Sequence, residues 1–93
     1  MVTFNETIVR SLTKSFEKKD IEGVVVNGSA TYNKDNALTD ANAAVYAGED
    51  FIGRMYYYGE SVRIEECKME NLAKVAEVVD ATISDLKENY PAE

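Results

Sequence analysis

The chain has 93 residues and a net charge of −7, and 45% of its residues are hydrophobic and 29% charged. These values are typical of a single globular domain over residues 1–93, and they exclude a low-complexity chain. Because an acidic surface repels phosphate groups, the charge also argues against direct binding of nucleic acid.

The cysteine and histidine content limits the cellular compartment and the catalytic or metal-binding chemistry that we expect for the protein. Cys67 is the only cysteine, and histidine is absent. A lone cysteine excludes an intrachain disulfide framework and is typical of a reducing compartment. The chain shows no signal-peptide pattern at its start and no apolar stretch of membrane-spanning length. We therefore expect a soluble, cytoplasmic protein without membrane contact.

The first predicted element is a helix over residues 4–18. Lys14 and Lys18 lie towards its end, where they suit the negative pole of the helix dipole. Thr3 and Glu6 have the spacing of a capping box at its start. Its apolar residues recur at every fourth position, at Phe4, Ile8, Leu12 and Phe16.

Residues 21–32 have the composition of β-structure, because Val24, Val25 and Val26 are β-branched. Asn27-Gly28 follows them directly and precedes a second strand-like run. Both residues accept the positive φ angles of a tight turn, so the pattern predicts a hairpin at this dipeptide. One long strand with a glycine bulge is the alternative.

The polar segment at residues 33–42 is predicted to be the longest loop. Asn33, Asp35 and Asp40 suggest a calcium-binding loop, but position 37 lacks an oxygen ligand and position 38 lacks the required glycine. Turn-forming asparagine and aspartate account for the composition. No metal site is predicted.

From residue 43 the pattern predicts a β-meander, with strands at residues 43–47, 51–58 and 62–67 joined by glycine-containing turns. The middle strand is apolar at both alternating sets of positions. One set is Phe51, Gly53, Met55 and Tyr57, and the other is Ile52, Arg54, Tyr56 and Tyr58. Such a strand lies in the centre of a sheet or is covered on both faces.

A long helix is predicted over residues 69–90. Its apolar stripe is Met69, Leu72, Ala76, Val79, Ile83, Leu86 and Tyr90. Val75 and Val78 widen this stripe to an arc of about 160°, which favours packing on a sheet over a coiled coil. Glu70, Glu77 and Glu88 are expected to face water.

The predicted fold is therefore α+β with two layers. An N-terminal helix precedes an antiparallel meander of four or five strands, and a long C-terminal helix packs on one sheet face.

Catalysis is not expected. Without histidine, the usual neutral-pH base and the commonest zinc ligand are missing. Glu65 and Glu66 point to opposite faces of a strand, and the glycines form no phosphate-binding cluster. Cys67 is interpreted as a small buried residue rather than a nucleophile. The sequence predicts no enzyme, no cofactor and no metal.

The three consecutive tyrosines are the most unusual feature of the chain. Because their side chains alternate in a strand, an uncovered sheet face would carry either Tyr56 and Tyr58 or Tyr57. Tyrosine is enriched in interface cores and binding hot spots. We therefore predict that these rings, together with Arg54, bind a protein partner or form a homodimer.

The resulting hypothesis is a small acidic, non-catalytic protein-interaction module. One alternative is an acidic decoy or inhibitor that occupies a basic site on another protein, such as a nucleic-acid-binding site, and whose association would depend strongly on salt. The other alternative is a small-molecule carrier with a cavity between the helices and the sheet.

Overall fold

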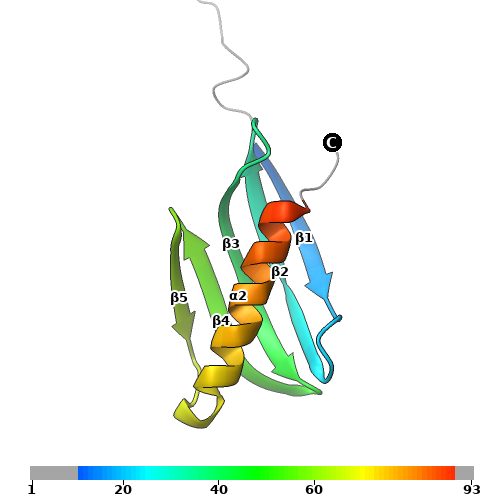
Figure 1. Ribbon diagram of the computed structural model, residues 1–93, viewed down its shortest axis with the longest axis vertical. Helices are drawn as coiled ribbons and strands as arrows, with labels where there is room; N and C mark the ends of the chain where they lie inside the picture. The colour runs from blue at the N-terminus through cyan, green and yellow to red at the C-terminus, as the bar shows by residue number, and fades with distance from the viewer. Residues whose placement is uncertain (1–10, 90–93) are drawn as a thin grey trace, which may run out of the picture.

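The computed structural model describes residues 11–89, which form an antiparallel sheet followed by a helix (Figure 1). The α+β class is confirmed, and the helix predicted over 69–90 is confirmed over Leu72–Glu88, with Met69–Asn71 in a 3₁₀ turn and Tyr90 outside the described residues. The strand order β1-β2-β3-β4-β5 is a meander with β1 and β5 at its edges. Within these residues no helix is both long and apolar enough to cross a membrane. The elements are β1 (Ser11–Lys18), β2 (Val24–Asn33), β3 (Leu38–Ala47), β4 (Asp50–Tyr58), β5 (Ser61–Glu65), a 3₁₀ turn η1 (Met69–Asn71) and α2 (Leu72–Glu88).

The predicted N-terminal helix is wrong over residues 11–18, which form β1, and its remainder at residues 4–10 lies outside the described residues. A spacing of four places Leu12 and Phe16 on one face of a strand as well as on one side of a helix, since four is a multiple of the strand period. Pairing with β2 selects the strand: Leu12 lies opposite Tyr32, and Phe16 lies opposite Gly28. That pairing partner is distant in sequence, so the local pattern does not reveal it.

The predicted hairpin at Asn27-Gly28 is also wrong, because β2 runs through the dipeptide as one strand. The alternative of a single strand is correct, but the irregularity lies at Thr31 and Tyr32 rather than at the glycine. A Cβ atom added to Gly28 would collide with the backbone of Asn42 and Ala43. The glycine therefore permits close approach of β3 and does not form a turn.

The hairpin that joins β2 to β3 is made by residues 34–37, so the predicted loop at 33–42 is mostly strand. Asn33 organises this turn, because its Oδ1 atom accepts hydrogen bonds from the amides of Asp35, at 2.9 Å, and Ala37, at 3.1 Å. Asn36 adopts a φ of 62°, which asparagine tolerates better than most residues.

One hydrophobic core joins the sheet to α2, which lies across a single face of the sheet in Figure 1. The strands contribute Val24, Val26, Ala30, Tyr32, Ala41, Ala43, Val45, Ile52, Met55 and Tyr57. The helix contributes Val75, Val78, Val79, Ile83 and Leu86. At about 1.5–3 kcal/mol for each fully buried large apolar side chain, this burial is the main contribution to the attachment of α2.

The buried side of α2 lies within the predicted apolar arc, but it is rotated away from the arc's first members. Met69 is 88% exposed and Leu72 is 46% exposed, whereas Val75 is completely buried. Gly53 explains the rotation, since a Cβ atom there would lie 3.2 Å from a methyl carbon of Val75. The glycine lets Val75 approach the sheet, and this turns Leu72 and Ala76 outward.

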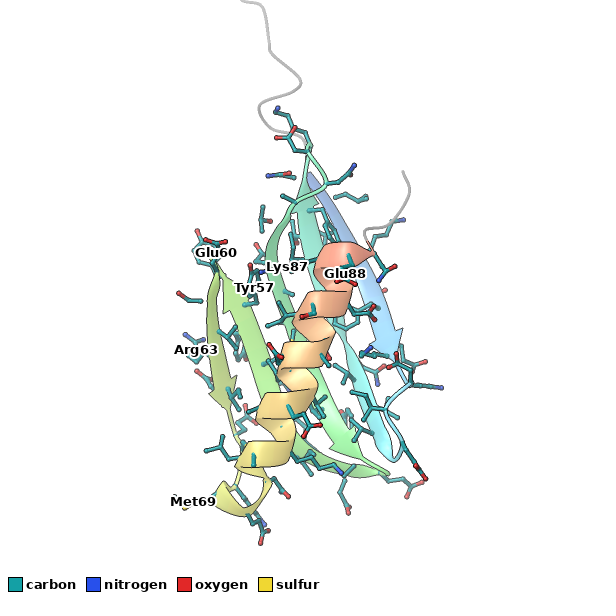
Figure 2. All side chains as sticks on the ribbon, viewed as in Figure 1. Tyr57, Glu60, Arg63, Met69, Lys87 and Glu88 are labelled. Atoms are coloured by element: carbon teal, nitrogen blue, oxygen red, sulfur yellow. The ribbon has the colours of Figure 1, made fainter. Side chains whose placement is uncertain are left out.

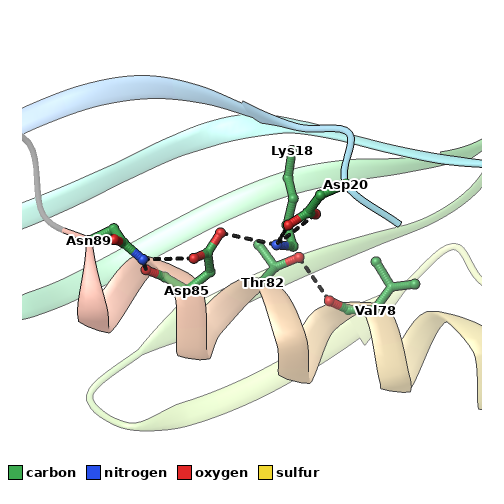
Figure 3. Close-up of polar contacts among 6 residues, drawn as sticks. All are labelled: Lys18, Asp20, Val78, Thr82, Asp85 and Asn89. Carbon is green, nitrogen blue, oxygen red and sulfur yellow. Dashed lines mark hydrogen bonds and ion pairs between the residues drawn. The ribbon is translucent and has the colours of Figure 1, made fainter. Parts of the chain in front are cut away.

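Polar contacts hold the C-terminal half of α2 to β1 and β2. The hydroxyl of Tyr32 donates a buried hydrogen bond to the carbonyl of Leu86, at 2.7 Å. Figure 3 shows the ammonium of Lys18 between Asp20, at 2.9 Å, and Asp85, at 3.0 Å. Hydrogen bonding to Asp20 raises the pKa of Lys18 and lowers the pKa of Asp20. Burial, and then the nearby charge of Asp85, raise the pKa of Tyr32.

The position of Val79 in the core gives a test of the buried side of α2. Val79→Asp should unfold the domain, a loss of about 4 kcal/mol or more, because it buries an unpaired carboxylate. Glu77 is exposed, and Glu77→Ala should change the free energy of unfolding by less than about 0.5 kcal/mol. Urea denaturation measures both values, and equal small shifts would refute the assigned side.

Tyr32 gives a test of pH dependence. Because its pKa is raised in the folded state, its contribution to stability is complete below about pH 10 and is lost as the pH rises further. Tyr32→Phe should cost about 1 kcal/mol at neutral pH, through the lost hydrogen bond. It should also make the alkaline decline in the urea midpoint shallower than in the wild type, whereas parallel declines would show that Tyr32 does not contribute to it.

Candidate functional site

An extra residue in β4 determines which side chains lie on each sheet face. Val45 pairs with Gly53, but Tyr46 pairs with Phe51, so Ile52 is the additional residue of a bulge. Ile52 is buried in the core, and Phe51 lies beside Tyr46. The prediction that grouped Phe51 with Tyr57, and Ile52 with Tyr56, is therefore wrong, because strict alternation holds only from Gly53 to Tyr58.

The four predicted site residues divide between the two faces of the sheet. Tyr57 is 3% exposed and belongs to the core, and the ammonium of Lys87 lies 5.4 Å from its ring centroid (Figure 2). Arg54, Tyr56 and Tyr58 occupy the alternate positions, on the face opposite α2, which we call the open face. Tyr58 is 76% exposed there.

Cross-strand contacts on the open face extend this set to a cluster that we call the aromatic–arginine patch. The rings of Tyr46 and Phe51 meet edge to face, with centroids 5.8 Å apart. The guanidinium of Arg54 lies 5.5 Å from the centroid of Phe51, and that of Arg63 lies 4.8 Å from the centroid of Tyr56. The patch consists of Tyr46, Phe51, Arg54, Tyr56, Tyr58 and Arg63.

Sequence reasoning did not identify Tyr46, Phe51 or Arg63 as members of the patch. Arg63 is opposite Tyr56 in the β4–β5 register, so pairing of the last two strands could have revealed it. Tyr46 and Phe51 flank the Gly48-Glu49 turn, but the bulge at Ile52 hides their shared face. No local pattern marks that bulge.

The patch borders an open depression of about 620 Å³ at the end of β4. Its lining includes aromatic rings from Tyr56 and Tyr58, the carboxylate residue Asp40 and the cationic residue Arg63. A surface of this kind offers flat apolar contact together with hydrogen-bond donors and acceptors.

Apart from Val25, which lies opposite Tyr46, the other half of the open face is polar. Thr13 and Thr31 share a hydrogen bond of 2.9 Å across β1 and β2, and the amide of Asn42 donates to Ser29 at 3.4 Å. These side chains are small and already hydrogen-bonded to one another. The aromatic surface is therefore confined to β3, β4 and β5.

The arginines of the patch keep hydrogen-bonding capacity. Nε of Arg54 lies 3.7 Å from a carboxylate oxygen of Glu66, and Arg63 forms an ion pair with Glu65. A guanidinium carries five N–H donors, so one carboxylate contact leaves donors for a partner.

Across residues 11–89 no cluster of histidine, cysteine, aspartate or glutamate has the geometry to hold a metal ion. Cys67 is half-buried after β5, where its thiol donates to the carbonyl of Lys68 at 3.5 Å. Comparisons with protein-family models, with characterised proteins and with solved structures find no match.

The surroundings of Cys67 predict its reactivity. Its Cβ atom packs close to Gly53, so a thiol reagent meets a partly covered sulfur in the native protein. Labelling in the native state should be slower by about tenfold or more than in denaturant. The Cys67→Ser variant provides the blank, and equally fast labelling of the native protein would reveal an activated thiolate.

Proposed function

We propose that the protein is a small, non-catalytic interaction module that binds a partner protein through the aromatic–arginine patch. In this proposal α2 covers one face of the sheet and stabilises it, while the opposite face is the recognition surface. A second copy presenting the same patch is the simplest alternative partner.

The observation that carries the proposal is the composition of the open face over β3 to β5. Tyrosine and arginine are the residue types most enriched at binding hot spots. Here Arg54 lies over the ring of Phe51 and Arg63 over the ring of Tyr56, and these contacts favour one arrangement of the four side chains before a partner arrives. A surface fixed in advance loses little conformational entropy on binding.

Exposure of the patch supports the same conclusion. Tyr58 is 76% exposed and Phe51 is 39% exposed, although both are large and mainly apolar. Contiguous apolar surface on a monomer often marks an interaction site. The polar half of the open face is a useful comparison. It also lies opposite α2, but it carries mainly threonine, serine and asparagine.

The acidic decoy is a second candidate, favoured by exposed carboxylates on η1 and α2. These belong to Glu70, Glu77, Asp80 and Glu88. Association through these groups would be screened by salt, because they lie in water. Binding through the patch would resist salt better, since stacking and apolar contact contribute most of it.

A double variant tests the proposal. Tyr56→Ser with Tyr58→Ser should abolish the capture of partner proteins from a lysate by the immobilised protein, because it removes the stacked and exposed rings. Thr13→Ala with Ser15→Ala alters the polar half of the same face and should preserve capture. Thermal denaturation should show both variants folded.

Tyr57→Ser separates binding from folding, since Tyr57 is buried. It should lower the free energy of unfolding by about 3 kcal/mol. If the double variant retains partners as well as the wild type does, the patch is not the binding surface. If moderate salt releases all partners from the wild type, the decoy replaces the proposal.

A further inference from the structure

The two edge strands of the sheet differ in how readily they could pair with an additional strand. On the α2 side, β1 carries Lys14 and Lys18, which share a face with Ala30 and Val26 of β2. Inward-facing charges at an edge are a known defence against strand pairing. On the same side β5 carries Val62, which is 50% exposed, and the half-buried Ile64. Within the described residues β5 pairs only with β4.

An open groove of about 340 Å³ runs between β5 and α2. Its apolar lining comes from Tyr57, Val62, Ile64, Ala76, Val79 and Ile83. Figure 2 shows Lys87 near the upper end of α2, Tyr57 of β4 beside it, and Glu60 at the tip of the β4–β5 hairpin. An added strand would hydrogen-bond to the edge of β5 and extend the wall of this groove.

We propose that β5 pairs antiparallel with β5 of a second copy of the chain, in a register centred on Ile64. The charges of β5 favour this occupant. Arg63 and Glu65 lie two positions apart and therefore project from the same face. With Ile64 opposite Ile64, each Arg63 lies opposite Glu65 of the other copy, and opposite charges at directly paired positions stabilise a sheet.

The register is self-complementary, as a two-fold interface requires. The same register reduces the electrostatic repulsion expected between two copies that each carry a net charge of −7. The two side-chain charges of β5 cancel, and pairing would let the ion pair that Arg63 and Glu65 form within one chain extend across the interface. A register centred on Arg63 would instead oppose two like charges, which destabilises pairing.

Pairing at β5 extends the proposed function. Arg63 belongs to both the edge strand and the aromatic–arginine patch, where it stacks on Tyr56. Antiparallel pairing about a two-fold axis perpendicular to the sheet keeps both open faces on the same side. The two patches would then join across the paired β5 strands into one surface, with the two Ile64 side chains side by side on the opposite face.

Charge reversal tests the register, with sedimentation equilibrium of the full chain as the readout. Arg63→Glu and Glu65→Arg should each raise the dissociation constant of the dimer by about tenfold, because each places like charges at both symmetric pairs. An equimolar mixture of the two variants should restore wild-type affinity, since every substituted side chain then faces its opposite charge. Lys14→Glu, with the same charge change as Arg63→Glu but on the other edge, should leave the dimer intact.

Four results would overturn the proposal. The wild-type chain could stay monomeric at the highest concentrations, or Glu65→Arg could dimerise as tightly as the wild type. Lys14→Glu could weaken association as much as Arg63→Glu, which would indicate general repulsion. Dimerisation could also be lost in the Tyr56→Ser, Tyr58→Ser variant but kept in the charge variants, which would place the interface on the open face. Thermal denaturation shows whether each variant is folded. If Arg63→Glu proves unstable, the dissociation constant of Glu65→Arg, alone and in the equimolar mixture, still tests the register.

Discussion

The close contact between α2 and the middle of the sheet is the constraint on which the rest of the structure depends. Val75 and Met55 are completely buried, and Gly53 leaves room for Val75 because it has no side chain. Short side chains such as Ala41 and Ala43 line β3 beneath the helix. This packing places a helix of 17 residues on one face of the sheet, and the opposite face has no helix on it among residues 11–89.

One-sided packing gives the consecutive tyrosines separate roles. Tyr57 is enclosed beside Lys87 and contributes to stability, whereas Tyr56 and Tyr58 project to the other side. The bulge at Ile52 likewise separates core from surface side chains, because it places Ile52 in the core and Phe51 near Arg54 on the open face. A single inserted residue thus adds an aromatic ring to the open face and an aliphatic side chain to the core.

The two edge strands of the sheet also differ in their surroundings. The edge at β1 is tied to the end of α2 through Lys18 and Asp85, and Tyr32 of β2 reinforces that junction with a buried hydrogen bond. The edge at β5 lies beside a groove instead and carries Val62 at its surface. Polar contacts therefore close one side of the domain, while apolar surface remains accessible on the other.

The sequence by itself determined the meander from residue 43 onward and the C-terminal helix, because their signals are local. Gly48 and Gly59 adopt the positive φ that their turns require, and the helical period is unambiguous. Tertiary structure alone decided that Ser11–Lys18 is a strand and that Gly28 lies inside β2. In these cases the local pattern suits two conformations, and contacts with residues distant in sequence select one. The aromatic–arginine patch illustrates both cases. Alternation along the strand predicts that Tyr56 and Tyr58 share a face, but only the bulge and the strand register place Phe51 and Arg63 with them.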